Sequence, residues 1–205
     1  MSSYKIRISP TETTTLDDYT AACALADQNA VYGAVVTDRL GQMIYAPHGE
    51  VAAAVLHHAK WVCDYIRDRE FVYGDAPINP AFNHDARIIS CDRLVDWVMF
   101  RCGYENQPVS HGECVCGPGL VDWCDRNGLI KITSTADLLP GDVVFTKPNA
   151  DGYPQHTFIH AGKADEEGMY YRYDAGKVER IRSTQPSCEP INDFMYGYRA
   201  PAVRR

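Results

Sequence analysis

The segment at positions 90–103 reads SCDRLVDWVMFRCG and carries the clearest helix signal in the chain. Its apolar residues recur at spacings of three and four, as on one face of a helix: Cys91, Leu94, Val95, Val98, Met99 and Cys102. Gly103 follows where such a helix would stop, and Ser90 precedes it as a good N-cap. The sequence therefore predicts a helix whose first residue is Cys91.

Two further helices flank this one along the sequence. Apolar residues repeat with helical spacing from Glu50 to about Arg67, which predicts a long amphipathic helix. A shorter helix is expected from Pro118, a residue favoured in the first turn, to Asn127, with Gly128 as its stop.

The pattern changes to short strands in the C-terminal part of the chain. Runs with strand composition alternate there with Gly, Pro and Asp turns, and they cover positions 142–146, 156–162, 169–174, 178–182 and 194–199. Helices that come first and an antiparallel sheet that follows indicate an α+β domain, with the helices packed on the sheet.

The first 46 residues differ from the rest. A polar stretch with four threonines at positions 11–15 is expected to be poor in strand. Positions 32–38 and 42–45 flank a turn at 39–41 and predict a β-hairpin. We therefore divide the chain into an N-terminal appendage, residues 1–46, and a main domain, residues 47–205.

Composition argues against several classes of function. The formal charge of −7 and the pI near 5.4 argue against nucleic-acid binding, because such proteins normally present a basic face. No apolar run approaches the roughly 18 residues that span a bilayer, and the N-terminus lacks the apolar core of a secretory signal. The eight cysteines are expected to be reduced, although their even number leaves a disulfide framework open.

Cys91 has the surroundings that a thiol nucleophile needs. The partial positive charge at a helix start favours a thiolate, and the free N–H groups of the first turn can hold an oxyanion. The alternative is that Cys91 is only the first buried residue of an apolar face. Helix periodicity alone does not decide between the two.

Four motifs in a fixed order favour the nucleophile. FVYG at 71–74 comes first, and Cys91 then opens its helix. LPGDVVF at 139–145 and HTFIHAG at 156–162 complete the series. Together they resemble the NlpC-type branch of the papain-like cysteine peptidases and amidases, over roughly residues 50–182.

This resemblance implies a papain-like α+β domain and a catalytic triad. Cys91 matches the nucleophile, His156 matches the general base, and Asp174 is the best match to the polar residue that orients the imidazole. In an antiparallel pair of strands, His156 and Asp174 lie on the same face if the numbers of two directly opposed residues add up to an even number. A turn near 165–166 would satisfy this condition. The alternative for Asp174 is an ordinary turn residue in the sequence DAG.

Two departures from the family's pattern bear on the substrate. The family commonly has Asp-Cys-Ser-Gly at the nucleophile, whereas this chain has Ser90, Cys91 and Asp92. A tyrosine that the family often carries near the oxyanion site aligns with Phe71, so that donor is either missing or replaced by Tyr73, two residues away. We expect Ser90, Asp92 and Tyr73 to line the oxyanion or substrate site.

Other candidate sites are weaker. His160 lies on the same strand face as His156 but about 13 Å away at strand rise, so a packing role is expected for it. A segment with His111, Cys114 and Cys116 near Cys124 could bind zinc, but Cys-x-Cys is a poor match to structural zinc sites. We therefore expect no metal and no cofactor.

The resemblance implies a hydrolase that cleaves amide bonds in peptidoglycan stem peptides, as an endopeptidase or amidase. The expected partner is peptidoglycan or a small peptide. A chain made without a signal peptide would act on the bacterial cell wall after release or export, as in a phage or prophage lysis system. Two alternatives stay open: a same-fold acyltransferase, deamidase or peptidase toxin with another substrate, and a non-catalytic binding module.

Overall fold

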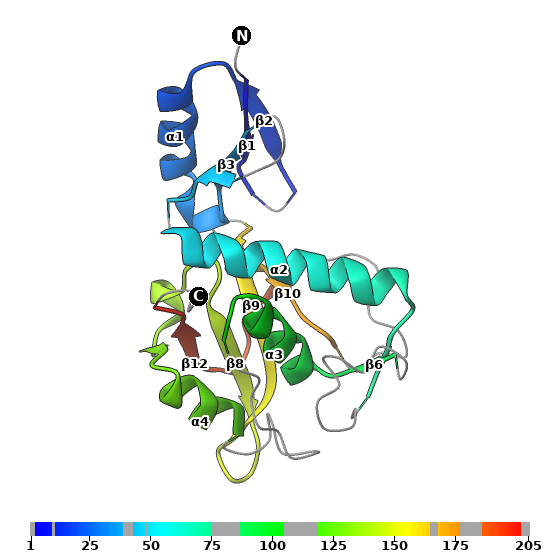
Figure 1. Ribbon diagram of the computed structural model, residues 1–205. Helices are drawn as coiled ribbons and strands as arrows, with labels where there is room; N and C mark the ends of the chain where they lie inside the picture. Colours follow the sequence, from blue (N-terminus) through cyan, green and yellow to red (C-terminus); the bar gives the residue numbers. More distant parts are fainter. Residues whose placement is uncertain are drawn as a thin grey trace.

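A six-stranded antiparallel sheet with the order β11-β10-β9-β8-β12-β7 forms the centre of the main domain in the computed structural model (Figure 1). Its strands are β7 (Ile130–Ile132), β8 (Val143–Pro148), β9 (Pro154–Lys163), β10 (Met169–Tyr173), β11 (Ser187–Pro190) and β12 (Phe194–Arg199). The structure describes residues 3–9, 11–38, 43–47, 49–74, 87–104, 119–164, 168–176 and 186–201.

Three α-helices precede the sheet in this domain, as expected for an α+β fold: α2 (Gly49–Asp68), α3 (Cys91–Arg101) and α4 (Gly119–Arg126). A short parallel pair, β5 (Val72–Tyr73) and β6 (Ile88–Ile89), leads into α3. The helices and one face of the sheet enclose the main apolar core, to which each of them contributes. Helical periodicity predicted α2 and α3 correctly. The helix α4 ends at Arg126, one residue before the predicted end, and Pro118 lies outside the described residues.

The central helix is α3, which Figure 1 shows in front of β9. Every residue from Cys91 to Met99 is buried, including the charged Asp92, Arg93 and Asp96. The apolar spacing seen in the sequence therefore marks only part of the buried surface of this helix. Because so many polar groups of α3 are buried, each needs a partner within the protein.

Four of the five predicted strands correspond to β8, β9, β10 and β12. The fifth, at 178–182, lies outside the described residues. The sequence reading missed β7, which has three residues, and β11, which contains a cysteine and ends in proline. Strands this short carry too few residues for an alternation to be recognised.

A β-bulge interrupts the pairing of β9 with β10. Gly162 lies opposite Tyr171, but the next pair is His160 with Arg172, so Ala161 is the extra residue on β9. Opposed residue numbers therefore change from an odd to an even sum at the bulge. Since side chains alternate between faces, this one residue decides which side chains of the two strands share a face.

The N-terminal region is more than the predicted hairpin. It forms a four-stranded sheet, β2-β1-β3-β4, from β1 (Tyr4–Arg7), β2 (Thr13–Leu16), β3 (Val35–Thr37) and β4 (Met43–Tyr45). One face packs on α1 (Tyr19–Gln28) around its own small core. The hairpin appears as the β3–β4 pair, but the threonine-rich stretch contains β2, so the expectation that it would be poor in strand was wrong. Threonine is β-branched and suits a strand, which explains why this polar stretch forms β2.

The N-terminal region also contacts β9 closely. The short helix η1 (Ala30–Tyr32) and Gly33 lie against the bulge. A Cβ atom on Gly33 would come within 2.7 Å of the Ala161 carbonyl oxygen, and one on Gly162 within 2.5 Å of the Tyr32 carbonyl carbon. Both glycines have positive φ, so their identity is required by backbone conformation and by close packing.

Candidate active site

Cys91 is the first residue of α3, as predicted, and Ser90 occupies the N-cap position in an extended conformation. The Ser90 side chain does not cap the helix, however. Its hydroxyl donates instead to Asp92 Oδ1 at 2.5 Å. The expected capping by Ser90 was thus wrong: capping would need the Ser90 oxygen to accept from a backbone N–H, and the structure shows this side chain only donating to the Asp92 carboxylate.

Three donors surround the Cys91 sulfur. The Tyr73 hydroxyl donates to Sγ at 3.9 Å, and the backbone N–H groups of Thr157 and Asp92 also hydrogen-bond to it. Tyr73 comes from β5, Thr157 from β9 and Asp92 from α3 itself. The thiol therefore lies where three elements meet, and these donors can stabilise negative charge on sulfur.

Burial has the opposite and larger effect on this thiol. Cys91 is only 3% exposed. Loss of hydration, followed by the neighbouring Asp92 carboxylate, raises the pKa of Cys91 to about 12 in spite of the lowering by the three donors. The expectation that the helix start would give a thiolate is therefore corrected: in this structure the thiol is protonated at neutral pH.

His156 and Asp174 form the second part of the site. His156 Nε2 lies 3.2 Å from Asp174 Oδ2. The bulge at Ala161 gives the even register that places both residues on one face, and without it they would lie on opposite faces of the sheet. The predicted juxtaposition of His156 with Asp174 is present, while the turn at 165–166 lies outside the described residues.

Arg172 is a member of this site that the sequence reading missed. Its Nε lies 3.3 Å from Asp174 Oδ2, the same oxygen that His156 contacts. Its other contacts are to Glu189 Oε2 at 2.5 Å, to Ser187 Oγ at 3.3 Å and to the Phe158 ring, 5.2 Å from the guanidinium carbon. Strand alternation could have revealed it, because Arg172 and Asp174 are two residues apart.

The two parts of the site adjoin but are not joined. Among the described residues, the side chains of Cys91 and His156 form no hydrogen bond with one another. The link is the backbone, since the Thr157 N–H at the sulfur belongs to the residue after His156. Catalytic contacts are often long before substrate binds, so this geometry leaves His156 as a candidate base.

Asp92 is buried beneath the nucleophile and is 2% exposed. One of its oxygens accepts from Ser90, and the other lies 4.0 Å from Arg93 Nε. Burial raises the pKa of Asp92, against the lowering by Ser90 and Arg93. Of the three residues expected to line the oxyanion or substrate site, Tyr73 is thus at the sulfur, while Ser90 and Asp92 form a buried pair beside it.

His160 lies in the same strand as His156 and is fully enclosed, at 1% exposure. Its ring packs edge-on against Tyr170, with 5.4 Å between ring centroids. This environment agrees with the packing role expected for it.

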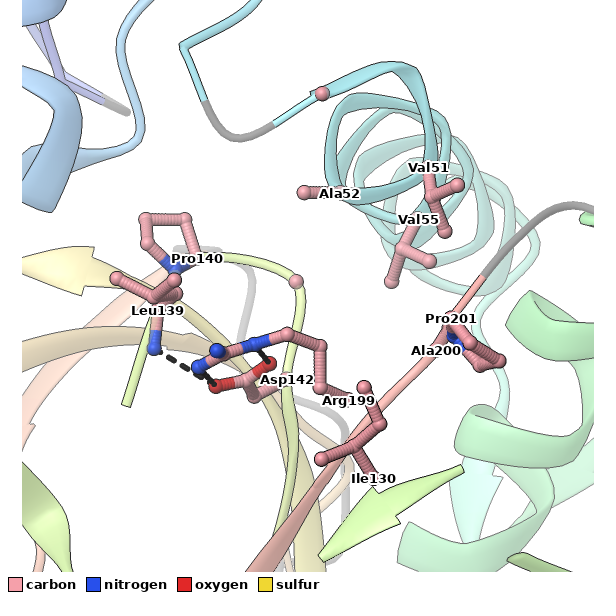
Figure 2. Close-up of a pocket in the computed structure, with 12 residues that line it drawn as sticks. Val51, Ala52, Val55, Ile130, Leu139, Pro140, Asp142, Arg199, Ala200 and Pro201 are labelled. Carbon is pink, nitrogen blue, oxygen red and sulfur yellow. Dashed lines mark hydrogen bonds and ion pairs between the residues drawn. The ribbon is translucent and has the colours of Figure 1, made fainter. Parts of the chain in front are cut away.

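The motif Leu139–Asp142 has a structural explanation. Arg199 of β12 forms a two-pronged ion pair with Asp142, at 2.9 and 2.8 Å, and the Leu139 N–H donates to Asp142 Oδ2 at 2.7 Å (Figure 2). Gly141 has positive φ, and a Cβ atom there would come within 2.9 Å of Ala52 in α2. The motif therefore fastens the loop before β8 to α2 and β12, beside a cavity of about 270 Å³ whose lining does not include Cys91, His156 or Asp174.

Other candidate groups add no further site. His111, Cys114 and Cys116 lie outside the described residues, and Cys124 is buried in α4. The six described cysteines are free thiols: Cys23, Cys63, Cys91, Cys102, Cys124 and Cys188. No described helix is both long enough and apolar enough to cross a bilayer.

Comparisons with known proteins add little to this geometry. No family model and no curated protein matches the chain. A solved structure, NlpC2 from Trichomonas vaginalis, is 13% identical to it with a TM-score of 0.41, and the match covers 98% of this chain and 70% of that one. A likeness of this size carries no argument, so the case for function rests on the residues and distances given above.

Proposed function

We propose that the chain is a cysteine hydrolase of the NlpC type that cleaves amide bonds in peptidoglycan stem peptides. Cys91 is the nucleophile, His156 the general base and Asp174 the residue that orients the imidazole. The observation that carries the proposal is the contact between His156 and Asp174. On β9, His156 directly precedes Thr157, whose backbone N–H hydrogen-bonds to the Cys91 sulfur. Peptidoglycan as substrate implies action at the bacterial cell wall, after release or export.

The tautomer of His156 follows from its partner. An ionised Asp174 accepts the proton carried by Nε2, which leaves the lone pair on Nδ1. Nδ1 is then the atom that removes the thiol proton. Because the resting thiol is protonated, this transfer accompanies the attack and does not precede it.

The reaction then proceeds in two halves. As the Cys91 sulfur bonds to the amide carbon, its proton passes to His156 and the carbonyl oxygen becomes an oxyanion. Collapse of this intermediate breaks the C–N bond, and the amine leaves with the proton from His156. Water then attacks the thioester, gives one proton to His156, and releases the carboxylic acid as the thiol is restored.

The oxyanion needs donors near the sulfur. The N–H groups of Asp92 and Thr157 and the Tyr73 hydroxyl already point at Sγ. The same donors can stabilise the charge that develops on the oxygen of the attacked carbonyl group, which lies two bonds from sulfur in the intermediate.

Mass analysis of fragments released from purified peptidoglycan of several chemotypes tests the proposal. The wild-type chain should release fragments cut at one type of amide bond, and Cys91→Ala should release none. Absence of released fragments from every chemotype would contradict the wall substrate.

The buried, protonated thiol favours one competing role, a non-catalytic binding module. A thiol-reactive peptide electrophile distinguishes the two. An enzyme should be labelled at Cys91 faster than His156→Ala is, because the base assists the attack. A binding module should be labelled equally slowly in both forms.

A further inference from the structure

A cleft of about 420 Å³ lies between the N-terminal sheet and α2. This volume falls within the range of small-molecule sites. The sheet contributes Arg7, Val35, Thr37 and Met43, and α2 contributes two alanines together with His57 and His58. Figure 1 shows the N-terminal sheet and α1 on one side of α2 and the large sheet on the other.

Strand alternation explains why this cleft exists. Ile6 of β1 and Val36 of β3 belong to the small core with α1. Their neighbours Arg7 and Val35 therefore point to the opposite face of the N-terminal sheet. That second face meets α2 only partly, and the space left between them is the cleft.

Arg7 is the charged group of this cleft. Its Nε atom is buried and has no hydrogen-bond partner. Within the part of the chain that the structure describes, its guanidinium forms no ion pair with a carboxylate. A partly buried cation without a counter-charge is unfavourable, and an anion bound beside it would offset that cost.

His58, which lines the cleft, carries a neutral donor. Arg101 Nε donates to His58 Nδ1 at 3.3 Å, so the proton of the neutral ring is on Nε2. Burial, followed by the nearby Arg101 and His57, lowers the pKa of His58. The ring is therefore uncharged at neutral pH and presents an N–H group.

Apart from Thr37, whose hydroxyl donates to the Lys5 carbonyl oxygen, the remaining walls are apolar. Val35 and Met43 on the sheet and two alanines of α2 face the same space, and Met43 is 39% exposed. Such walls disfavour a fully polar dianion and suit a short hydrocarbon chain.

We propose that this cleft binds a small organic carboxylate with a short apolar body. The carboxylate pairs with Arg7, and the apolar body lies against Val35 and Met43. The site is independent of the hydrolase reaction, since none of the proposed catalytic residues lines it. It gives the N-terminal region a binding role of its own.

Calorimetric titration of the full chain with hexanoate tests the proposal, with hexanamide and inorganic phosphate as comparisons. Hexanoate should bind saturably, and both comparisons should bind more weakly. Hexanamide has the apolar body without charge, and phosphate has the charge without an apolar body. No saturable binding of hexanoate, or equal affinity for hexanamide, would overturn the proposal.

Variants of β1 test the role of Arg7. Arg7→Gln should weaken hexanoate binding about tenfold to a hundredfold, as expected for loss of a hydrogen-bonded charge, and Arg7→Lys should keep part of it. Lys5→Gln is the matched control, because Lys5 is exposed and lies two residues away on the same strand face, outside the lining. Equal weakening by Lys5→Gln would mean general charge attraction and would overturn the proposal, as would wild-type affinity in a folded Arg7→Gln.

A peptide C-terminus is the other source of a carboxylate. A short apolar peptide and its C-terminal amide, titrated in the same way, separate the two sources. Binding of the free acid more tightly than hexanoate would overturn the small organic acid in favour of a peptide. Weaker binding of that peptide supports the proposal as stated.

Discussion

The two parts of the candidate site are built in opposite ways. Cys91 stands at the start of a buried helix, among neutral donors and 3% exposed. His156 stands on β9 and Asp174 directly follows β10, beside the charged Arg172 and Glu189. Burial therefore determines the state of the sulfur, which stays protonated, whereas charge determines the orientation of the imidazole. Catalysis requires Cys91 to exchange a proton with His156, and a substitution can disable either part of the site separately.

The largest effect is expected from the sulfur part. Cys91→Ala should lower turnover by on the order of 10⁴-fold or more, because the nucleophile is gone. The change removes one small buried atom, so the thermal midpoint should move little. Cys102→Ala, at the C-cap of the same helix and equally buried, is the matched control and should keep activity. Wild-type turnover in purified Cys91→Ala would remove this residue from the site.

The strand part is tested by its two histidines. His156→Ala should be nearly as damaging to turnover as Cys91→Ala, since members of a catalytic unit act together. His160→Ala should keep most turnover per folded molecule but lower the thermal midpoint, because a fully buried ring leaves a cavity. Turnover and thermal midpoints of both variants measure this. Equal loss of turnover in both would contradict the assignment of His156.

A smaller effect is expected at Asp174. Asp174→Asn keeps the shape but loses the charge that stabilises the imidazolium, and turnover should fall about 10²- to 10⁴-fold. Arg172→Gln should cost about tenfold, because Asp174 keeps its contact with His156 but loses a second anchor; Arg172→Lys should recover part of this. If Asp174 is only a turn residue, Asn should preserve activity and Ala should lower stability alone.

The bulge that aligns the strand part offers a milder perturbation. Gly162→Ala should lower both the thermal midpoint and turnover, because its Cβ would clash with the Tyr32 backbone. Gly168→Ala is the matched control, since Gly168 also has positive φ but nothing within 4 Å of an added Cβ. Both variants lose about 1–2 kcal/mol to backbone strain. A Gly162→Ala chain no less stable than Gly168→Ala would show that close packing at the bulge is unimportant.

The smallest effect concerns the pH dependence of Cys91 alkylation. Only the thiolate reacts, and with a pKa of about 12 its fraction should keep rising with pH far above the range of an ordinary thiol. Asp92→Asn removes the second cause of the raised pKa, so the rise should shift to lower pH. Alkylation rates of Cys91, measured by peptide mass analysis across alkaline pH, show the shift. A rate that levels off near pH 8 would contradict the dominance of burial.

The sequence predicted those features that depend on a long periodic signal. The apolar spacing in α2 and α3 extends over several turns, and the bounds of β12 were predicted residue for residue. The start of α3 at Cys91 followed from Ser90 and the first apolar position. What Ser90 does there did not follow, because its bond to Asp92 depends on side-chain geometry in a buried turn.

The pairing of His156 with Asp174 was anticipated only in part. An even register was stated as the condition, but the bulge at Ala161 that provides it leaves no sequence signal of its own. Close contact of Gly33 and Gly162 with neighbouring backbone explains the bulge after the fact. Burial of Cys91 could not be predicted either, since it depends on elements far apart in the chain. This burial raises the pKa of the thiol and so reverses the charge state expected for it.

The position of β12 has a consequence for synthesis. In the sheet this strand lies between β8 and β7, although it follows both in the chain. When translation has reached residue 193, β7 therefore has no neighbouring strand in this sheet and one edge of β8 is unpaired. Open strand edges promote association between unfinished chains. Arg199, which ties β12 to Asp142, is made with this strand, so the central sheet can close only after β12 has been synthesised.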